Sequence, residues 1–163
     1  MYRLTPQAAK AVNLFPWQKQ EFFTHDEKAQ LVEAIQQAEQ RTSGEVRVFV
    51  ESHCRYVDPL DRAKEVFDSL KMGDTAERNA TLVYVAVKDR QAAVYGDAGI
   101  HEKVGQRYWE DEVNKMLVCF RQQHLAEGLI QVVRDIGEAL HYYFPYDHTT
   151  DKNELPDDIV FGR

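Results

Sequence analysis

The chain has 163 residues, a formal net charge of −7 at neutral pH and a pI near 5.4. Its length predicts one domain that can bury a core without disulfides or metals. The acidic charge argues against a nucleic-acid-binding face, which would be basic, and no segment reaches the ~20 apolar residues that a membrane-spanning helix needs.

The N-terminal residues 1–23 read as an arm that precedes the domain. Its apolar residues form a cluster: Leu14, Phe15, Trp17, Phe22 and Phe23. Large apolar clusters rarely stay exposed, so one interpretation is an arm packed on the domain. The alternative is a docking segment for a partner. The chain opens without a basic region followed by an apolar run, and Cys54 and Cys119 form no CxxC pair, so we expect a cytoplasmic protein with free thiols.

The first helix is predicted to begin at Thr24, because Thr24 and Glu27 fit a capping box. Gly44 is predicted to end it in a left-handed conformation. Residues 45–51 then alternate as a strand, with Val46, Val48 and Val50 on one face. Phe49 points to the other face, which indicates that this face is partly covered as well.

A second helix is predicted to start at Asp58-Pro59, an N-cap followed by proline at the first helical position, and to end at Gly73. Residues 81–87 form a nearly continuous apolar run, which is typical of a strand covered on both faces. A strand-helix-strand order predicts that the two strands are parallel with a right-handed crossover.

The short turn at 88–91 predicts that residues 92–95 return as an antiparallel strand, followed by a glycine-bounded acidic loop at 96–99. Helices are predicted over 109–123 and 125–144. The domain therefore covers residues 24–145, and residues 146–163 form an acidic C-terminal tail. Within this tail, residues 159–161 are apolar enough to fold back on the domain.

Motifs for several common chemistries are missing from the sequence. It contains no P-loop, no GxGxxG after a strand, no HxxxH pair and no GxSxG elbow. Seven residues separate Cys54 from Arg62, whereas a cysteine-phosphatase loop has five, so a structural thiol is the favoured interpretation of Cys54. The acidic residues Asp58 and Asp61 at the start of the second helix disfavour a bound phosphate.

Carboxylates near strand ends are the remaining candidates. Glu51 and Asp89 should share the carboxyl edge of the parallel strands, where Arg90 accompanies them. The third strand runs back, so Asp97 should lie near Asn79 and Glu45 at the opposite edge. Such hard oxygen ligands suit Ca²⁺ or Mg²⁺. Each carboxylate is also explained by a cap, a turn or a solvated charge.

Several short segments, in this order and spacing, resemble the TPM-domain family, in particular its short stand-alone bacterial members. They are 41–48 (RTSGEVRV), 58–63, 78–79, 82–90, 96–100, 102–104 and 153–157 with 161–162. Ala80 departs from the pattern, since the family usually has glycine there. The resemblance implies an α/β fold, a three-layer α/β/α sandwich around a small, mixed, mostly parallel sheet. It also implies phosphatase-like activity, divalent-cation binding, or roles in photosystem repair and membrane-receptor assembly.

Three functions follow as hypotheses. The first is a soluble divalent-cation-binding interaction module that assists a membrane-associated partner. The second is a weak metal-assisted phosphatase, in which Asp89 would hold the metal and Arg90 would neutralise the phosphoryl oxygens. The third is a structural partner protein without a ligand.

Overall fold

The computed structural model describes residues 22–146 and 159–162. The elements follow the chain in this order: α2 (His25–Gln40), β1 (Glu45–Glu51), α3 (Pro59–Ser69), β2 (Ala80–Ala86), β3 (Gln91–Gly96), α4 (Ala98–Val104), α5 (Gln106–Arg121), α6 (Leu125–Tyr143) and β4 (Ile159–Phe161).

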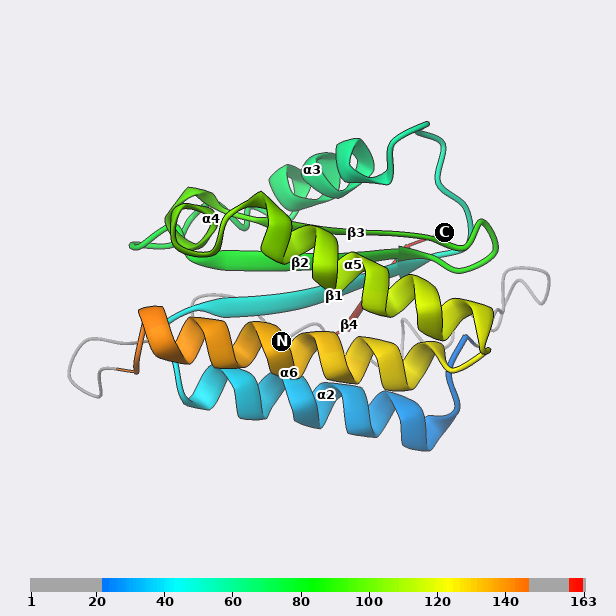
Figure 1. Cartoon of the computed structure of the whole chain (residues 1–163), viewed down its shortest axis with the longest axis horizontal. Helices are drawn as coiled ribbons and strands as arrows, with labels where there is room; N and C mark the ends of the chain where they lie inside the picture. Colours follow the sequence, from blue (N-terminus) through cyan, green and yellow to red (C-terminus); the bar gives the residue numbers. More distant parts are fainter. Residues whose placement is uncertain (1–21, 147–158, 163) are drawn as a thin grey trace, which may run out of the picture.

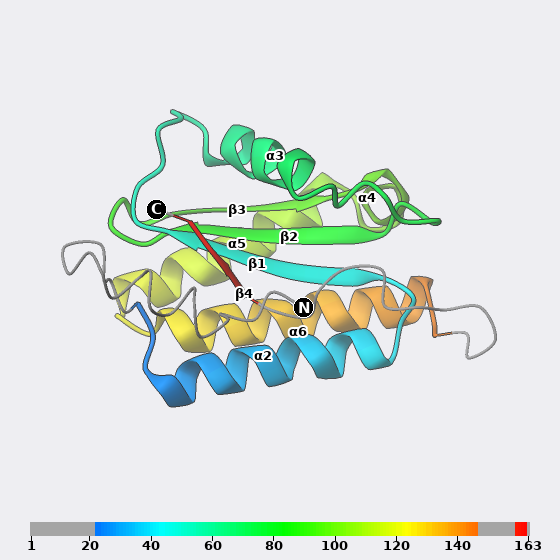
Figure 2. The ribbon, with the colours of Figure 1, turned by 180° about the vertical axis from the view of Figure 1, so that it is seen from behind.

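The described strands form one mixed sheet in the order β3-β2-β1-β4. β1 is parallel to β2 and to β4, and β3 is antiparallel to β2. α2, α5 and α6 pack on one face of the sheet, and α3 packs on the other (Figures 1 and 2). This arrangement confirms the predicted α/β/α sandwich.

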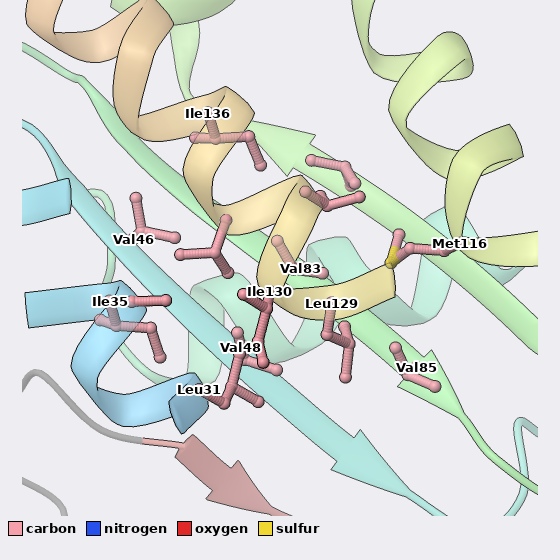
Figure 3. Packing of buried hydrophobic residues seen from close by; sticks show 14 of the residues in the cluster. Leu31, Ile35, Val46, Val48, Val83, Val85, Met116, Leu129, Ile130 and Ile136 are labelled. Atoms are coloured by element: carbon pink, nitrogen blue, oxygen red, sulfur yellow. The ribbon is translucent and has the colours of Figure 1, made fainter. Parts of the chain in front are cut away.

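The two central strands are buried along their whole length, as their apolar sequences predict. Val46, Val48 and Val50 point into the larger core, which they share with α2 and α6. Figure 3 shows Val46 and Val48 there among side chains from the helices and from β2. Phe49 lies on the opposite face and stacks against Tyr84 at 6.1 Å between ring centroids, so this face is covered too, as predicted.

Both predicted helix starts are confirmed. The Thr24 hydroxyl accepts a hydrogen bond from the Glu27 amide at 3.1 Å, and the Glu27 carboxylate accepts one from the Thr24 amide at 2.8 Å. At α3, Asp58 Oδ1 accepts a hydrogen bond from the Leu60 amide at 2.9 Å, with Pro59 at the first helical position. These caps satisfy amides that have no partner within the helix.

The predicted roles of Gly44 and Gly73 as helix ends are wrong. α2 ends at Gln40 and α3 at Ser69, where Lys71, with φ of 55°, takes the left-handed conformation instead. Gly44 is needed for another reason, because a Cβ there would lie 2.7 Å from Leu140 of α6. Its small size allows a close approach of chain segments that sequence spacing does not reveal.

The segment that follows β3 also differs from the prediction. Residues 98–104 form the short helix α4, with Asp97 as its N-cap, so the last part of the loop predicted at 96–99 is helical. Gly105, with φ of 80°, separates α4 from α5, which begins three residues earlier than expected and ends two residues earlier. The helical signal of α4 is weak because it spans only seven residues.

Ile159–Phe161 pairs with β1 as a parallel strand, so the prediction that this segment folds back is confirmed. Phe23 is buried and lies 6.5 Å from Phe161 between ring centroids. The rest of the predicted arm and most of the predicted tail lie outside the described residues. Whether the arm packs on the domain or docks a partner stays a prediction.

Glu112 of α5 is a carboxylate buried between helices, with 2% of the residue exposed. Lys115 Nζ donates to Glu112 at 2.7 Å and to Asp135 of α6 at 2.8 Å. Burial, with a further contribution from Asp135, raises the pKa of Glu112 from 4.5 to about 7. The folded chain therefore holds this proton at pH values where the unfolded chain has released it.

The raised pKa of Glu112 predicts a stability that falls as the pH rises from about 4.5 to about 7, and then levels off. Glu112→Gln cannot lose the proton, so this variant should lack that part of the slope, which amounts to at most about 3 kcal/mol. Urea unfolding at several pH values measures it. Glu110→Gln, an exposed position on the same helix, is the control. If the unfolding free energies of wild type and Glu112→Gln changed with pH in the same way, the raised pKa of Glu112 would be contradicted.

Gly96, the last residue of β3, is a second position where a substitution should lower the stability of the fold. A Cβ there would lie 2.2 Å from the Trp109 ring, which is itself buried. We expect Gly96→Ala to lower the unfolding free energy by about 1–3 kcal/mol, as overpacking does. Gly73→Ala, whose Cβ would meet nothing closer than 3.9 Å, should change it far less. Thermal unfolding of both variants provides the comparison. Equal losses of stability in the two variants would show that the contact with Trp109 does not destabilise Gly96→Ala.

Candidate functional site

The predicted site residues lie at two opposite ends of the central strands. The register pairs Glu45 with Ala80 at one end and Glu51 with Ala86 at the other. We call the first end, where β1 and β2 begin, the amino edge, and the second the carboxyl edge. α4 lies at the amino edge (Figure 1). The six predicted residues therefore do not form a single site, as the strand directions predicted.

Glu51, at the carboxyl edge, is tied to its neighbours by strong hydrogen bonds. Its carboxylate accepts from Arg62 of α3 at 2.9 and 3.0 Å, and from the Tyr84 hydroxyl of β2. Arg62 also lies 5.7 Å from the centroid of the Phe49 ring. Burial and the hydrogen bond to Glu51 raise the pKa of Tyr84. Glu51 thus joins β1, β2 and α3, which is a structural role.

Asp89 belongs to the same end but has different partners. Its carboxylate lies 2.9 Å from His53 Nδ1 and accepts a hydrogen bond from the Cys54 amide at 2.7 Å. These two contacts lower the pKa of Asp89. Arg90 is exposed in the adjacent turn, with φ of 51°. Asp89 therefore organises the loop after β1, and a catalytic role for Asp89 and Arg90 stays a prediction.

The amino edge holds two buried carboxylates on either side of Ala80. Glu45 pairs with Ala80 across the parallel strands, and the Asp97 amide donates to the Ala80 carbonyl at 2.9 Å. Glu45 shares its strand face with Phe49, which packs on the α3 side. Asp97 reaches the same side, since a Cβ on Gly73 would lie 4.0 Å from its Oδ2. The two acids are 3% and 1% exposed.

Arg78 supplies the counter-charge to Asp97. Its Nε and Nη2 donate to the two carboxylate oxygens at 2.7 and 2.8 Å, a bidentate pair. Asp97 Oδ1 also accepts a hydrogen bond from the Ala98 amide at 2.8 Å, which caps α4. The side chains differ sharply in exposure, 57% for Arg78 and 2% for Asp97. The carboxylate is therefore fixed inside the protein, while the guanidinium lies on it from the solvent side.

Asn79 connects this edge to the segment before β1. Its Nδ2 donates to the Ser43 hydroxyl at 3.2 Å, and its backbone carbonyl accepts from the Glu45 amide at 3.4 Å. The Ser43 hydroxyl in turn lies 3.5 Å from the Glu77 carboxylate. Asn79 is 1% exposed, and within the described part of the chain its Oδ1 has no hydrogen-bond partner. Such a buried oxygen suits a water molecule or a cation.

The donor set at the amino edge is small. Within residues 22–146 and 159–162, no three His, Cys, Asp or Glu side chains lie close enough together to hold a metal ion. The oxygen atoms that Glu45, Asp97 and Asn79 offer at this edge are of the hard type that Mg²⁺ and Ca²⁺ prefer. Mg²⁺ usually keeps several water ligands and binds only one or two carboxylates, so it needs fewer protein ligands than an ion held in a full protein cage.

Sequence reasoning misses Arg78, Ser43 and Glu77 as members of this edge. Arg78 and Asn79 precede β2, so only their position before a buried strand marks them in the sequence. The partner of Arg78 lies 19 residues further on, at the end of a strand that has to return antiparallel. The pairing therefore depends on the β2–β3 hairpin, which the sequence predicts only in outline.

No helix in the described segments is long and apolar enough to cross a membrane. A location in the cytoplasm stays a prediction.

Comparisons with known proteins agree with the fold. The family model described as the TPM domain matches residues 18–139. The NMR structure of the BA42 protein from the psychrophilic bacterium Bizionia argentinensis is 40% identical, covers 88% of this chain and 98% of that chain, and has a TM-score of 0.79. The N-terminal domain of the cg2496 protein from Corynebacterium glutamicum is 13% identical over 72% of this chain and 74% of that one, with a TM-score of 0.53, which shows the fold alone.

Three of the segments on which the family resemblance rests lie at the amino edge. Residues 41–48, 78–79 and 96–100 all contribute to the hydrogen bonds described there. The family model spans about three quarters of the sequence. The chain therefore belongs to the TPM domain family.

Proposed function

We propose that this protein is a divalent-cation-binding interaction module that takes Ca²⁺ or Mg²⁺ at the amino edge through Glu45, Asp97 and Asn79. The observation that carries the proposal is the pair of buried carboxylates on either side of Ala80. Neighbouring strands lie about 4.8 Å apart, so the backbones of Glu45 and Asp97 are about 10 Å apart. Both side chains leave the sheet on its α3 side.

Electrostatics favours a cation between these groups. A carboxylate removed from water loses hydration energy that a counter-ion or hydrogen bonds must replace. Two such groups on the same face of a sheet add their fields in a region of low dielectric constant. A divalent ion would add to the counter-charge that Arg78 already places on Asp97, and the Asn79 oxygen would offer a neutral ligand of the same hard type.

Exposed tyrosines beside the amino edge support the interaction part of the proposal. Tyr142 is 77% exposed at the end of α6, and Tyr143 and Tyr146 are exposed next to it. The Tyr146 amide donates to the Arg41 carbonyl at 3.2 Å, so this tyrosine patch adjoins the segment that leads into β1. Tyrosine is enriched in protein interfaces. We propose that the patch docks a partner protein, membrane-associated as the family resemblance implies, and that the protein works in the cytoplasm.

A backbone-amide NMR titration with CaCl₂ and MgCl₂ tests cation binding. We expect saturable shifts at Glu45, Asn79 and Asp97, and about a tenfold or greater loss of affinity in Asp97→Asn, which removes a charged ligand. Asparagine is also a good N-cap, so α4 should persist. Asp89→Asn, at the carboxyl edge, is the matched control and should bind as wild type does.

Two results would contradict the proposal. The absence of saturable shifts at millimolar metal, the weak end of protein affinities for Ca²⁺, would favour a structural partner without a ligand. Shifts centred on Glu51 and Asp89, lost in Asp89→Asn, would move the site to the carboxyl edge and favour the metal-assisted phosphatase.

A further inference from the structure

The N-terminal half of α5 is joined to α6 by polar groups, which we call the Glu112 cluster: Tyr108, Glu112, Lys115 and Asp135. We propose that this cluster is a proton-dependent switch, in which a proton on Glu112 keeps α5 closed and loss of the proton lets the first turns of α5 unwind. The inference concerns a different part of the molecule from the proposed cation site and does not depend on it.

Glu112 occupies a core position of its helix. The buried residues of α5 are Trp109, Glu112, Met116 and Phe120, so a carboxyl group interrupts an otherwise apolar face. Its Oε1 is buried and, among the described residues, has no hydrogen-bond partner. A protonated acid tolerates such a place far better than an ionised one, whose charge would be left buried and only partly compensated. The closed position of α5 therefore favours the protonated form.

The groups that face Glu112 strengthen this preference. Lys115 Nζ, on the same helix, donates to Glu112 at 2.7 Å and to Asp135 of α6 at 2.8 Å. One ammonium group thus faces two carboxyl groups, so a full negative charge remains once both acids are ionised. From the sheet, β3 contributes apolar residues to the core on this side, Ala92 and Val94.

Two aromatic residues next to Glu112 complete the contacts of this half of α5. The Tyr108 hydroxyl donates to the Asp135 carbonyl at 3.0 Å. Trp109 is buried, and its Nε1 donates to Nδ1 of His101 in α4 at 2.9 Å. Unwinding of the first turns would break both hydrogen bonds. The side chain of Glu112 would then reach water, where the ionised form is stable.

The two ends of α5 differ in how firmly they are held. The helix begins after Gly105, which has φ of 80° and offers no side-chain cap, so its first amides lack that support. Towards the other end, a Cβ on Gly128 of α6 would lie 2.7 Å from the Cβ of Cys119, so the helices are in close contact there. Unwinding can therefore start at Gly105 and stop before Cys119 without separating α5 from α6 completely.

Hydrogen–deuterium exchange of the wild-type protein between pH 5 and pH 8, corrected for the intrinsic rate at each pH, tests the switch. We expect the amides of residues 110–115 to exchange through an opening of their own, about tenfold or more faster than those of β1. The pKa of Glu112 is about 7 in the closed form and 4.5 when the side chain is exposed. The opening equilibrium should therefore rise by more than about tenfold from pH 5 to pH 7 and then level off.

Glu112→Gln keeps the shape of the side chain and cannot ionise, so the rise with pH should disappear in this variant. Glu110→Gln, at an exposed position of the same helix, is the matched control and should open as wild type does. If residues 110–115 exchanged no faster than β1, only global unfolding would free α5, and the inference would be overturned. A wild-type opening that does not change between pH 5 and pH 7 would overturn it, as would a rise that persists in Glu112→Gln.

Discussion

The parallel pairing of β1 with β2 is the constraint on which the rest of the molecule depends. Both strands are buried on both faces, so their register is fixed by packing as well as by hydrogen bonds. This register places Glu45 beside Ala80 at one end and Glu51 beside Ala86 at the other. The hairpin to β3 then brings Asp97 to the first end. A slip of β1 by one residue would turn its two acids, Glu45 and Glu51, to the opposite face of the sheet.

The two ends of the sheet use buried acids differently. Glu51 is satisfied by groups from the adjoining α3 and β2, Arg62 and the Tyr84 hydroxyl, and so it stabilises the fold. Asp97 instead relies on a cationic side chain that is largely in water. Such a pair contributes less to stability than a well-enclosed one, because solvent screens it.

Local signals in the sequence predict much of the fold. The capping box at Thr24, the Asp58-Pro59 start and the alternation in residues 45–51 each depend on neighbours a few positions away, and each is confirmed. The sequence did not reveal why Gly44 and Gly96 must be small, because Leu140 and Trp109, the side chains that they contact, are distant in sequence. The division of the candidate acids between two edges was predicted from strand direction. The Arg78–Asp97 pair was not, because it depends on side-chain positions across the hairpin.

The claim that joins the fold to the function is that a cation binds at the amino edge. Paramagnetic Mn²⁺, which shares the hard oxygen preference of Mg²⁺, broadens the NMR signals of amides in order of their distance from the ion. We predict the strongest broadening, at low Mn²⁺, around Glu45, Ala80 and Asp97, and we expect excess Mg²⁺ to displace the Mn²⁺. Broadening centred on the carboxyl edge around Asp89, or spread evenly over surface acids, would contradict it.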